Sequence, residues 1–184
     1  MTIRRSISAL AAALSLLPVS GAVAALPCFT ATVVAVSDGD TVTVERADKS
    51  RVKVRLRYVD CPEVARNRRQ SDQPGGKEAK AYASKLLLGE GVVNVSICPH
   101  GTSYGRIVAD IAMGDKDVAH LLVEQGHAQL DPRYKPPKTL REAEAAAKLA
   151  DVGLWAGEGE PIPPWEWRKR QRERLIELRR TRQP

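Results

Sequence analysis

Four carboxylates lie in two short segments of the sequence. Asp38-Gly39-Asp40 stands between segments rich in β-forming residues, where an Asp-Gly pair is a strong signal for a hairpin turn. Asp60-Cys61-Pro62-Glu63 follows a strand-like segment, and the proline restricts the backbone before it, so that the preceding carbonyl has a fixed direction. Carboxylates and a carbonyl are the hard oxygen ligands of Ca²⁺, not the sulfur and imidazole ligands of zinc. The two segments therefore predict a calcium site.

The two aspartates of the turn are expected to differ in role. Asp40 begins a strand that faces Asp60, so it is the predicted metal ligand. Asp38 is expected to close the turn through hydrogen bonds to its own backbone, as Asp side chains commonly do.

Two arginines are placed to bind a phosphate near these carboxylates. Arg55 belongs to a segment that alternates apolar and basic residues, which predicts a strand with Arg55 on its solvent-facing side. Arg106 begins a second strand after a turn. A cation and two guanidinium groups offset the charge that grows in phosphodiester hydrolysis, and a further carboxylate can accept a proton from water. Strict alternation puts Arg55 and Asp60 on opposite faces, so the strand must bend or end before Asp60.

Five strands and three helices are expected to position these residues. The patterns predict strands over 30–36, 41–46, 51–59, 92–97 and 106–113, with a turn over 99–103. They predict helices over 77–88, 118–125 and 139–150, the second with Asp117 as its N-cap. This order predicts an α+β fold with a small, five-stranded barrel, and it suggests the oligonucleotide-binding (OB) type of barrel.

The first 25 residues have the pattern of a signal peptide. Arg4 and Arg5 precede an apolar stretch over 7–19, and small residues then favour cleavage near Ala24 or Ala25. The apolar stretch is short for a membrane span, so export is expected without stable membrane insertion, and a membrane anchor is the alternative. Export would expose the cysteines to an oxidising compartment, where Cys28 and Cys98 could meet at one end of the barrel. The sequence alone does not fix this pairing.

The basic character of the chain is concentrated at its C-terminus. The net charge is +7, yet residues 25–164 hold 19 acidic and 19 basic residues. We therefore divide the chain into a domain over 26–156, a linker over 157–164 and a basic, helical tail over 165–184. The tail could bind nucleic acid or the anionic cell envelope, or be a merely solvated face. Trp165 and Trp167 are expected to fold back onto the barrel.

Five segments, in this order, resemble the staphylococcal (thermonuclease-type) nuclease family. They are Asp38-Gly39-Asp40-Thr41, residues 55–63, Tyr104-Gly105-Arg106, residues 122–128 and Tyr134-Lys135-Pro136, and together they span about 30–155. The resemblance implies a calcium-dependent phosphodiesterase on an OB-type barrel that cuts DNA and RNA to products with a 3′-phosphate. Single strands are the expected partner, and the protein is expected to be a monomer.

The resemblance also implies a role for individual residues. It implies that calcium is held by Asp40, Asp60 and the carbonyl of Cys61. Arg55 and Arg106 resemble the phosphate clamp. Glu63 resembles the residue that holds or deprotonates the attacking water, and Tyr134 resembles one of two tyrosines in the nucleotide pocket.

Two departures from the family pattern concern the substrate. Pro132 replaces the other pocket tyrosine, and Ser103 stands where a lysine is frequent. The loop residues Arg66, Arg68 and Arg69 could compensate by binding the strand backbone, or the loop could be merely solvated. The alternative function is a non-catalytic OB-fold module that binds single strands.

Overall fold

Alternating apolar side chains give the first half of the chain its strands. The computed structural model describes residues 28–88 and 94–181, so the predicted signal peptide lies outside the described residues. Strands β1 (Phe29–Asp38), β2 (Thr41–Glu45) and β3 (Arg51–Leu56) form an antiparallel meander. Val42, Val44 and Val54 are fully buried in its core. Strands with one apolar face and one solvent-facing face are expected to form such an antiparallel meander.

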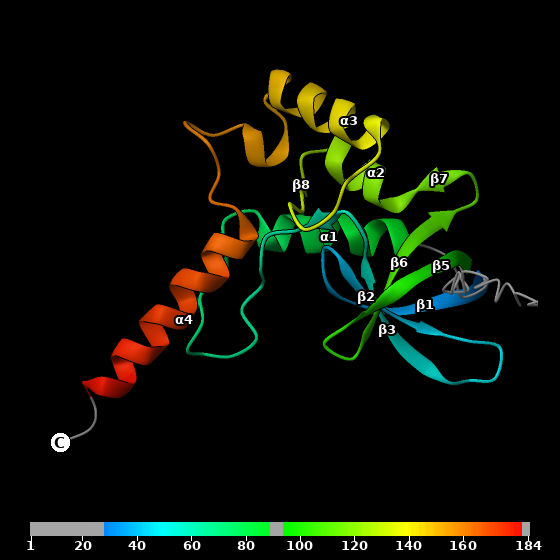
Figure 1. Ribbon diagram of the computed structural model, residues 1–184, viewed down its shortest axis with the longest axis horizontal. Helices are drawn as coiled ribbons and strands as arrows, with labels where there is room; N and C mark the ends of the chain where they lie inside the picture. The colour runs from blue at the N-terminus through cyan, green and yellow to red at the C-terminus, as the bar shows by residue number, and fades with distance from the viewer. Residues whose placement is uncertain (1–27, 89–93, 182–184) are drawn as a thin grey trace, which may run out of the picture.

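A parallel pairing closes the sheet into a barrel. Strands β5 (Asn94–Ser103) and β6 (Arg106–Met113) pair antiparallel, β5 also pairs with β1, and β6 pairs in parallel with β3. The predicted five-stranded OB-type barrel is thereby confirmed (Figure 1). The turn predicted over 99–103 is wrong: β5 continues through it with an irregularity at Pro99 and Gly101, because the hairpin closes only at Tyr104-Gly105.

Helices and three short strands surround the barrel. Asp117 caps α2 as predicted, since its carboxylate accepts hydrogen bonds from the amides of Ala119 and His120. The remaining elements are β4 (Val59–Asp60), α1 (Gly76–Leu87), β7 (Lys116–Asp117), α2 (Val118–Glu124), β8 (Gln129–Leu130), α3 (Lys138–Leu149), a 3-10 helix over Gly153–Trp155, and α4 (Pro164–Arg180). Among the described helices, none has the length and apolarity that a membrane crossing requires.

The chain breaks sharply between Arg55 and Asp60, as the alternation required. Strand β3 ends at Leu56, and Tyr58 adopts a left-handed conformation with φ of 69°. The two-residue strand β4 then pairs with β8, away from the barrel sheet. Because of this break, the side chains after Tyr58 no longer follow the alternation of β3, and the Asp60 side chain points toward Arg55.

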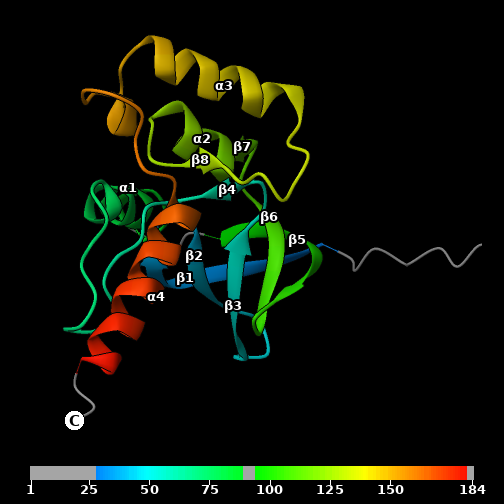
Figure 2. The ribbon, with the colours of Figure 1, turned by 60° about the vertical axis from the view of Figure 1, so that its left-hand side comes forward.

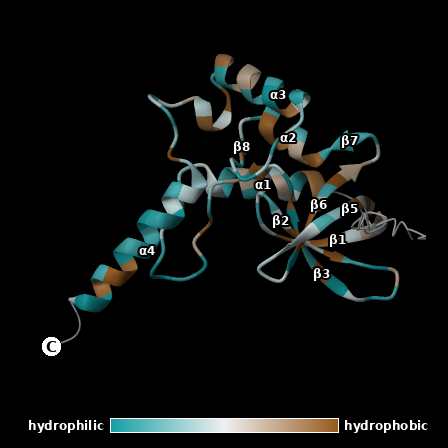
Figure 3. Ribbon diagram, in the orientation of Figure 1, coloured by the Kyte–Doolittle hydropathy of each residue, from teal (hydrophilic) through white to brown (hydrophobic). Residues whose placement is uncertain are grey.

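The basic C-terminal segment is a helix that lies against the barrel domain. Helix α4 begins at Pro164 and is largely hydrophilic (Figure 3). Three side-chain hydrogen bonds hold its start: Gln73 donates to the Ile162 carbonyl at 2.7 Å, Gln129 to the Pro161 carbonyl at 3.5 Å, and Gln171 to Ser71 at 2.9 Å. The helix therefore runs beside the loop that precedes α1 (Figure 2).

A disulfide joins Cys28 to Cys98. It ties the residue before β1 to the middle of β5, which pairs with β1 in the barrel. Cys61 is the free cysteine, and it is buried.

Candidate active site

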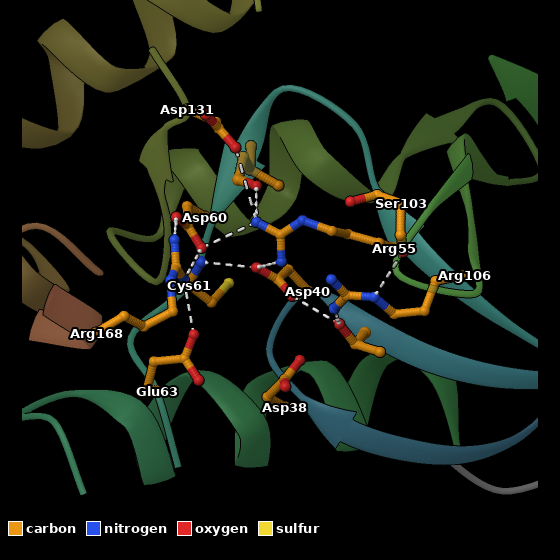
Figure 4. Close-up of polar contacts among 12 residues, drawn as sticks. Asp38, Asp40, Arg55, Asp60, Cys61, Glu63, Ser103, Arg106, Asp131 and Arg168 are labelled. Atoms are coloured by element: carbon orange, nitrogen blue, oxygen red, sulfur yellow. Dashed lines mark hydrogen bonds and ion pairs between the residues drawn. The ribbon is translucent and has the colours of Figure 1, made fainter. Parts of the chain in front are cut away.

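Arg55 is the centre of a buried ionic network (Figure 4). Its two terminal nitrogens donate to Asp40 at 2.7 Å and to Asp60 at 2.9 Å, and Asp131 lies 3.7 Å away. The expectation that Arg55 lies on a solvent-facing side is wrong, because only 5% of the residue is exposed. Strand β3 pairs on both sides in the closed barrel, and the β4–β8 pair lies over this end of it.

Asp131 is a member of this network that the sequence did not single out. It follows β8, and its backbone amide donates to the Tyr58 carbonyl at 2.7 Å. Its carboxylate accepts hydrogen bonds from the guanidinium and the amide of Arg133. Burial alone would raise the pKa of Asp131, but the hydrogen bonds from Arg133 lower it, so the carboxylate is charged. The available signal was the Asp-Pro-Arg sequence at 131–133, directly before the Tyr134-Lys135-Pro136 segment.

The hairpin turn and the Cys61 segment are in direct contact. A Cβ on Gly39 would lie 2.7 Å from the Cys61 sulfur, so only glycine allows this approach. The Cys61 amide donates to Asp40 at 3.1 Å, and the Thr41 hydroxyl donates to the same carboxylate at 2.9 Å. Burial opposes ionisation of Asp40, but the Arg55 charge and the Cys61 amide outweigh it and lower its pKa. Asp40 and Asp60 are thus brought together on one guanidinium.

Asp38 does not play the structural role expected from its position. Its Oδ1 atom is buried and has no hydrogen-bond partner in the described part of the chain, and the guanidinium of Arg66 lies 3.7 Å from Oδ2. Burial, followed by the nearby Asp40 carboxylate, raises the pKa of Asp38 to about 7. A buried oxygen without a hydrogen-bond partner costs free energy. The position of Asp38 therefore suits the binding of a ligand better than the stabilisation of the turn.

A cavity of about 1050 Å³ opens beside this network. Arg55, Glu63 and Arg106 all line it, so the three predicted catalytic side chains face one space. Arg106 reaches it from the start of β6, where its guanidinium donates to the Ser103 carbonyl at 3.4 Å and the Thr41 hydroxyl at 3.3 Å. The cavity also has a strongly basic wall, made of Lys53, Arg66, Lys80, Arg133, Arg168 and Arg172.

Arg168 of α4 is the residue at this site that sequence reasoning missed. Its guanidinium donates to both oxygens of Asp60, at 2.9 and 2.6 Å, and to Glu63 at 2.6 Å. Burial alone would lower the pKa of Arg168, but the bonds and charges of Asp60 and Glu63 raise it well above its usual range. The segment was assigned to a separate tail, and only its position after Trp165 and Trp167 hinted at contact.

Three of the four predicted substrate-binding residues do not line this cavity. Tyr134 does not line the cavity, and its ring packs edge-on against Tyr58 with centroids 6.1 Å apart. Arg66 lines the cavity, whereas Arg68 and Arg69 line a separate one against α4.

The donor chemistry suits a hard cation, although the arrangement is not a closed metal cage. The described residues contain no group of three or more His, Cys, Asp or Glu side chains arranged to hold a metal ion. Asp40 and Asp60, which are buried against Arg55, and the unpartnered oxygen of Asp38 are nevertheless carboxylate donors, which is the type that calcium prefers. A cation bound to Asp60 would compete with Arg168 for the same oxygens.

Comparison with known proteins agrees with this arrangement. Residues 53–157 match the family model described as staphylococcal nuclease homologue. An uncharacterized endonuclease of Haemophilus influenzae is 30% identical over 144 residues, covering 78% of this chain and 75% of that protein. A thermonuclease of Staphylococcus intermedius is 28% identical over 125 residues, covering 65% of this chain and 72% of that protein.

Plant proteins match a smaller part of their own length. The staphylococcal-like nuclease CAN1 of Arabidopsis thaliana is 34% identical over 120 residues, which cover 65% of this chain and 34% of that protein. The chain spans about a third of the length of the plant relatives that it matches. The family model covers more than half of the chain and includes Arg55, Asp60, Glu63 and Arg106. The chain therefore belongs to the staphylococcal nuclease family.

Proposed function

We propose that this protein is a calcium-dependent nuclease that hydrolyses phosphodiester bonds of DNA and RNA and leaves 3′-phosphate products. The observation that carries the proposal is the shared cavity of Arg55, Glu63 and Arg106 beside the Asp40 and Asp60 carboxylates. Family membership supports nuclease chemistry in general.

Each residue of the site has a distinct chemical task in this proposal. Arg55 fixes the Asp40 and Asp60 carboxylates and adds positive charge to the cavity wall. Arg106 offers its guanidinium to a phosphate oxygen, because it lines the cavity and has no carboxylate within ion-pair distance in the described structure. Glu63 is half-buried at the same cavity and holds or deprotonates the attacking water.

Calcium would be held by Asp40, Asp60 and the Cys61 carbonyl, with Asp38 nearby. When bound, such a cation stabilises negative charge on the phosphate oxygens. The Cys61 thiol itself is an unsuitable ligand, because burial raises its pKa well above the usual range and keeps it protonated.

The test compares release of acid-soluble nucleotide from denatured DNA and from RNA, with calcium and with a chelator. The E63Q variant should lose about 10²- to 10⁴-fold in kcat, the usual contribution of a general base. The E158Q variant is the control, because Glu158 is exposed and remote from the cavity lining. Release that is unaffected by the chelator would sink the calcium requirement, and wild-type rates in E63Q would remove Glu63 from the reaction.

A single-strand-binding module without catalysis is the second candidate. The contact of Arg168 with Asp60 and Glu63 favours it, because that contact occupies the groups that hydrolysis needs. Retained affinity for oligonucleotides without any cleavage, in calcium, would support this function instead.

We also propose that the mature protein is exported after cleavage near Ala24 or Ala25. The disulfide between Cys28 and Cys98 supports an oxidising compartment. N-terminal sequencing of the protein from periplasmic and extracellular fractions tests this, and an uncleaved N-terminus in the cytoplasm would contradict it.

A further inference from the structure

Three neighbouring cavities follow α4 away from the proposed catalytic centre. The large cavity and a smaller one of about 200 Å³ share residues 63–66 together with Arg168 and Arg172. The smaller cavity shares Leu175 with a third one of about 380 Å³. The result is a groove between α4 and the loop before α1, and Figures 1 and 2 both show these two segments side by side.

The far end of this groove carries positive charge without compensation. Arg68, Arg69, Arg174 and Arg179 line the third cavity, and all four are exposed. Within residues 28–88 and 94–181, none of their guanidinium groups has a carboxylate within ion-pair distance. The other residues that line this cavity are uncharged: Asn67, Leu175 and Leu178.

Several exposed basic residues elsewhere have acidic neighbours: Lys49 pairs with Glu45, Lys77 with Asp72, and Lys138 with Glu142. The third cavity instead gathers four arginines that have none among the described residues. Four guanidinium groups held around one concave space repel each other, so their arrangement favours a ligand that carries several negative charges.

We propose that the end of this groove is a second phosphate-binding site, which holds the backbone of a single strand extending from the catalytic centre. The proposal rests on the nuclease function proposed above. Arg168 and Arg179 are eleven residues apart on α4, or about 16 Å at 1.5 Å per residue. One strand carries a charge about every 3.4 Å along a stacked helix, so the groove spans four or five phosphates.

The groove also offers surface for bases. Trp167 lines its middle, and Leu175 and Leu178 line its far end. Aromatic and apolar side chains beside a basic track are typical of sites that bind single strands without sequence preference. The arginines line a concave groove that leads along α4 toward the proposed catalytic cavity, which favours a strand over a flat, anionic membrane surface.

The test uses the double variant R174Q/R179Q of the full chain and the control K169Q/R170Q. The control removes the same charge from the same helix, at two exposed residues that do not line the groove. Binding of fluorescent oligothymidylate of about twelve nucleotides and of a dinucleotide is measured by anisotropy with a chelator present. R174Q/R179Q should weaken binding of the longer probe about tenfold, lower the slope of log K against log salt by about 1.4, and spare the dinucleotide.

The possible outcomes separate this inference from the proposed function. Equal losses in both double variants, or no loss in R174Q/R179Q, would overturn the second site even if the enzyme cleaves DNA. A loss confined to the longer probe supports the site even if no cleavage is ever detected. Loss of binding to phosphatidylglycerol vesicles, with oligonucleotide binding intact, would assign the arginines to a lipid surface and overturn the proposal.

Discussion

At the residue scale, the guanidinium groups at the site differ in what they contact. Both terminal nitrogens of Arg55 are engaged by buried carboxylates, so this residue supports the fold as well as the chemistry. Removing one partner of a buried ion pair typically costs about 3–5 kcal/mol of stability. A loss of activity in an Arg55 variant is therefore expected to include a loss of folded protein. Arg106 and Glu63 are only half-buried, and their variants report on catalysis more directly.

Arg168 is expected to compete with calcium for Asp60. In R168Q the competing charge is gone, so calcium should bind roughly tenfold more tightly, equivalent to about 1.4 kcal/mol. Isothermal titration calorimetry without substrate measures this, with K169Q as the control because Lys169 is exposed on the same turn. Unchanged or weaker calcium affinity in R168Q would show that the guanidinium and the cation do not share the carboxylate.

The raised pKa of Asp38 predicts a pH dependence of stability. The folded carboxyl titrates at about 7 and an unperturbed Asp at 3.8, so between these values only the folded state keeps the proton. The free energy of unfolding should therefore fall as pH rises from about 4 to about 7, and stay lower above that. D38N removes this dependence.

Urea unfolding in a chelator checks this expectation. Relative to the wild type, D38N should gain on the order of 3 kcal/mol between about pH 5 and about pH 8. The control is D115N, at an exposed aspartate. A parallel pH profile for the wild type and D38N would refute the assigned protonation.

At the element scale, the loop that leads into α1 holds the Glu63 segment in place. The backbone amide of Glu63 donates to the side-chain oxygen of Gln73 at 3.1 Å, and the backbone amide of Gln73 donates to the backbone carbonyl of Glu63 at 2.9 Å. Gln73 also donates to Ile162 just before α4, so one buried side chain links both walls of the site.

Gly76 is expected to tolerate no side chain, because a Cβ there would lie 2.5 Å from the Glu63 carbonyl oxygen. G76A should shift the Glu63 segment and lower kcat by about 10²-fold, the effect of a displacement near 1 Å. Steady-state kinetics on denatured DNA measure it. G157A is the matched control, since a Cβ on Gly157 meets nothing within 4 Å. A wild-type kcat in G76A would mean that the segment position does not limit the reaction.

At the scale of the whole molecule, two long-range connections hold the described chain around its core. The disulfide closes a loop of 70 residues between the start of β1 and β5, and the β3–β6 pairing closes the barrel. Removing the disulfide with C28S/C98S should lower the free energy of unfolding by about 4 kcal/mol, from the entropy of a loop of this length.

Urea unfolding of the wild type with and without reductant, and of C28S/C98S, measures this loss. The double variant should be insensitive to reductant, and its remaining thiol, on buried Cys61, should react only after unfolding. Equal stability of the wild type in both conditions would contradict a structural role for the disulfide.

The sequence by itself determined the barrel and named most of the residues of the proposed catalytic set. Periodicity predicted the strands that carry Arg55 and Arg106, because burial of one strand face imposes a period of two. The Asp-Gly turn and the proline after Cys61 predicted rigid backbone at the proposed ligands, since both restrict φ and ψ locally.

Only the tertiary structure decided what depends on contacts between distant residues. Burial of Arg55, inclusion of Asp131 and the unpartnered oxygen of Asp38 all follow from closure of the barrel and pairing of β4 with β8. The contact of Arg168 with Asp60 joins residues 108 positions apart, and a charge-rich helix has no local pattern that selects one partner. Its selection is a matter of packing, because the hydrogen bonds of Gln73 and Gln171 hold α4 where Arg168 reaches the site.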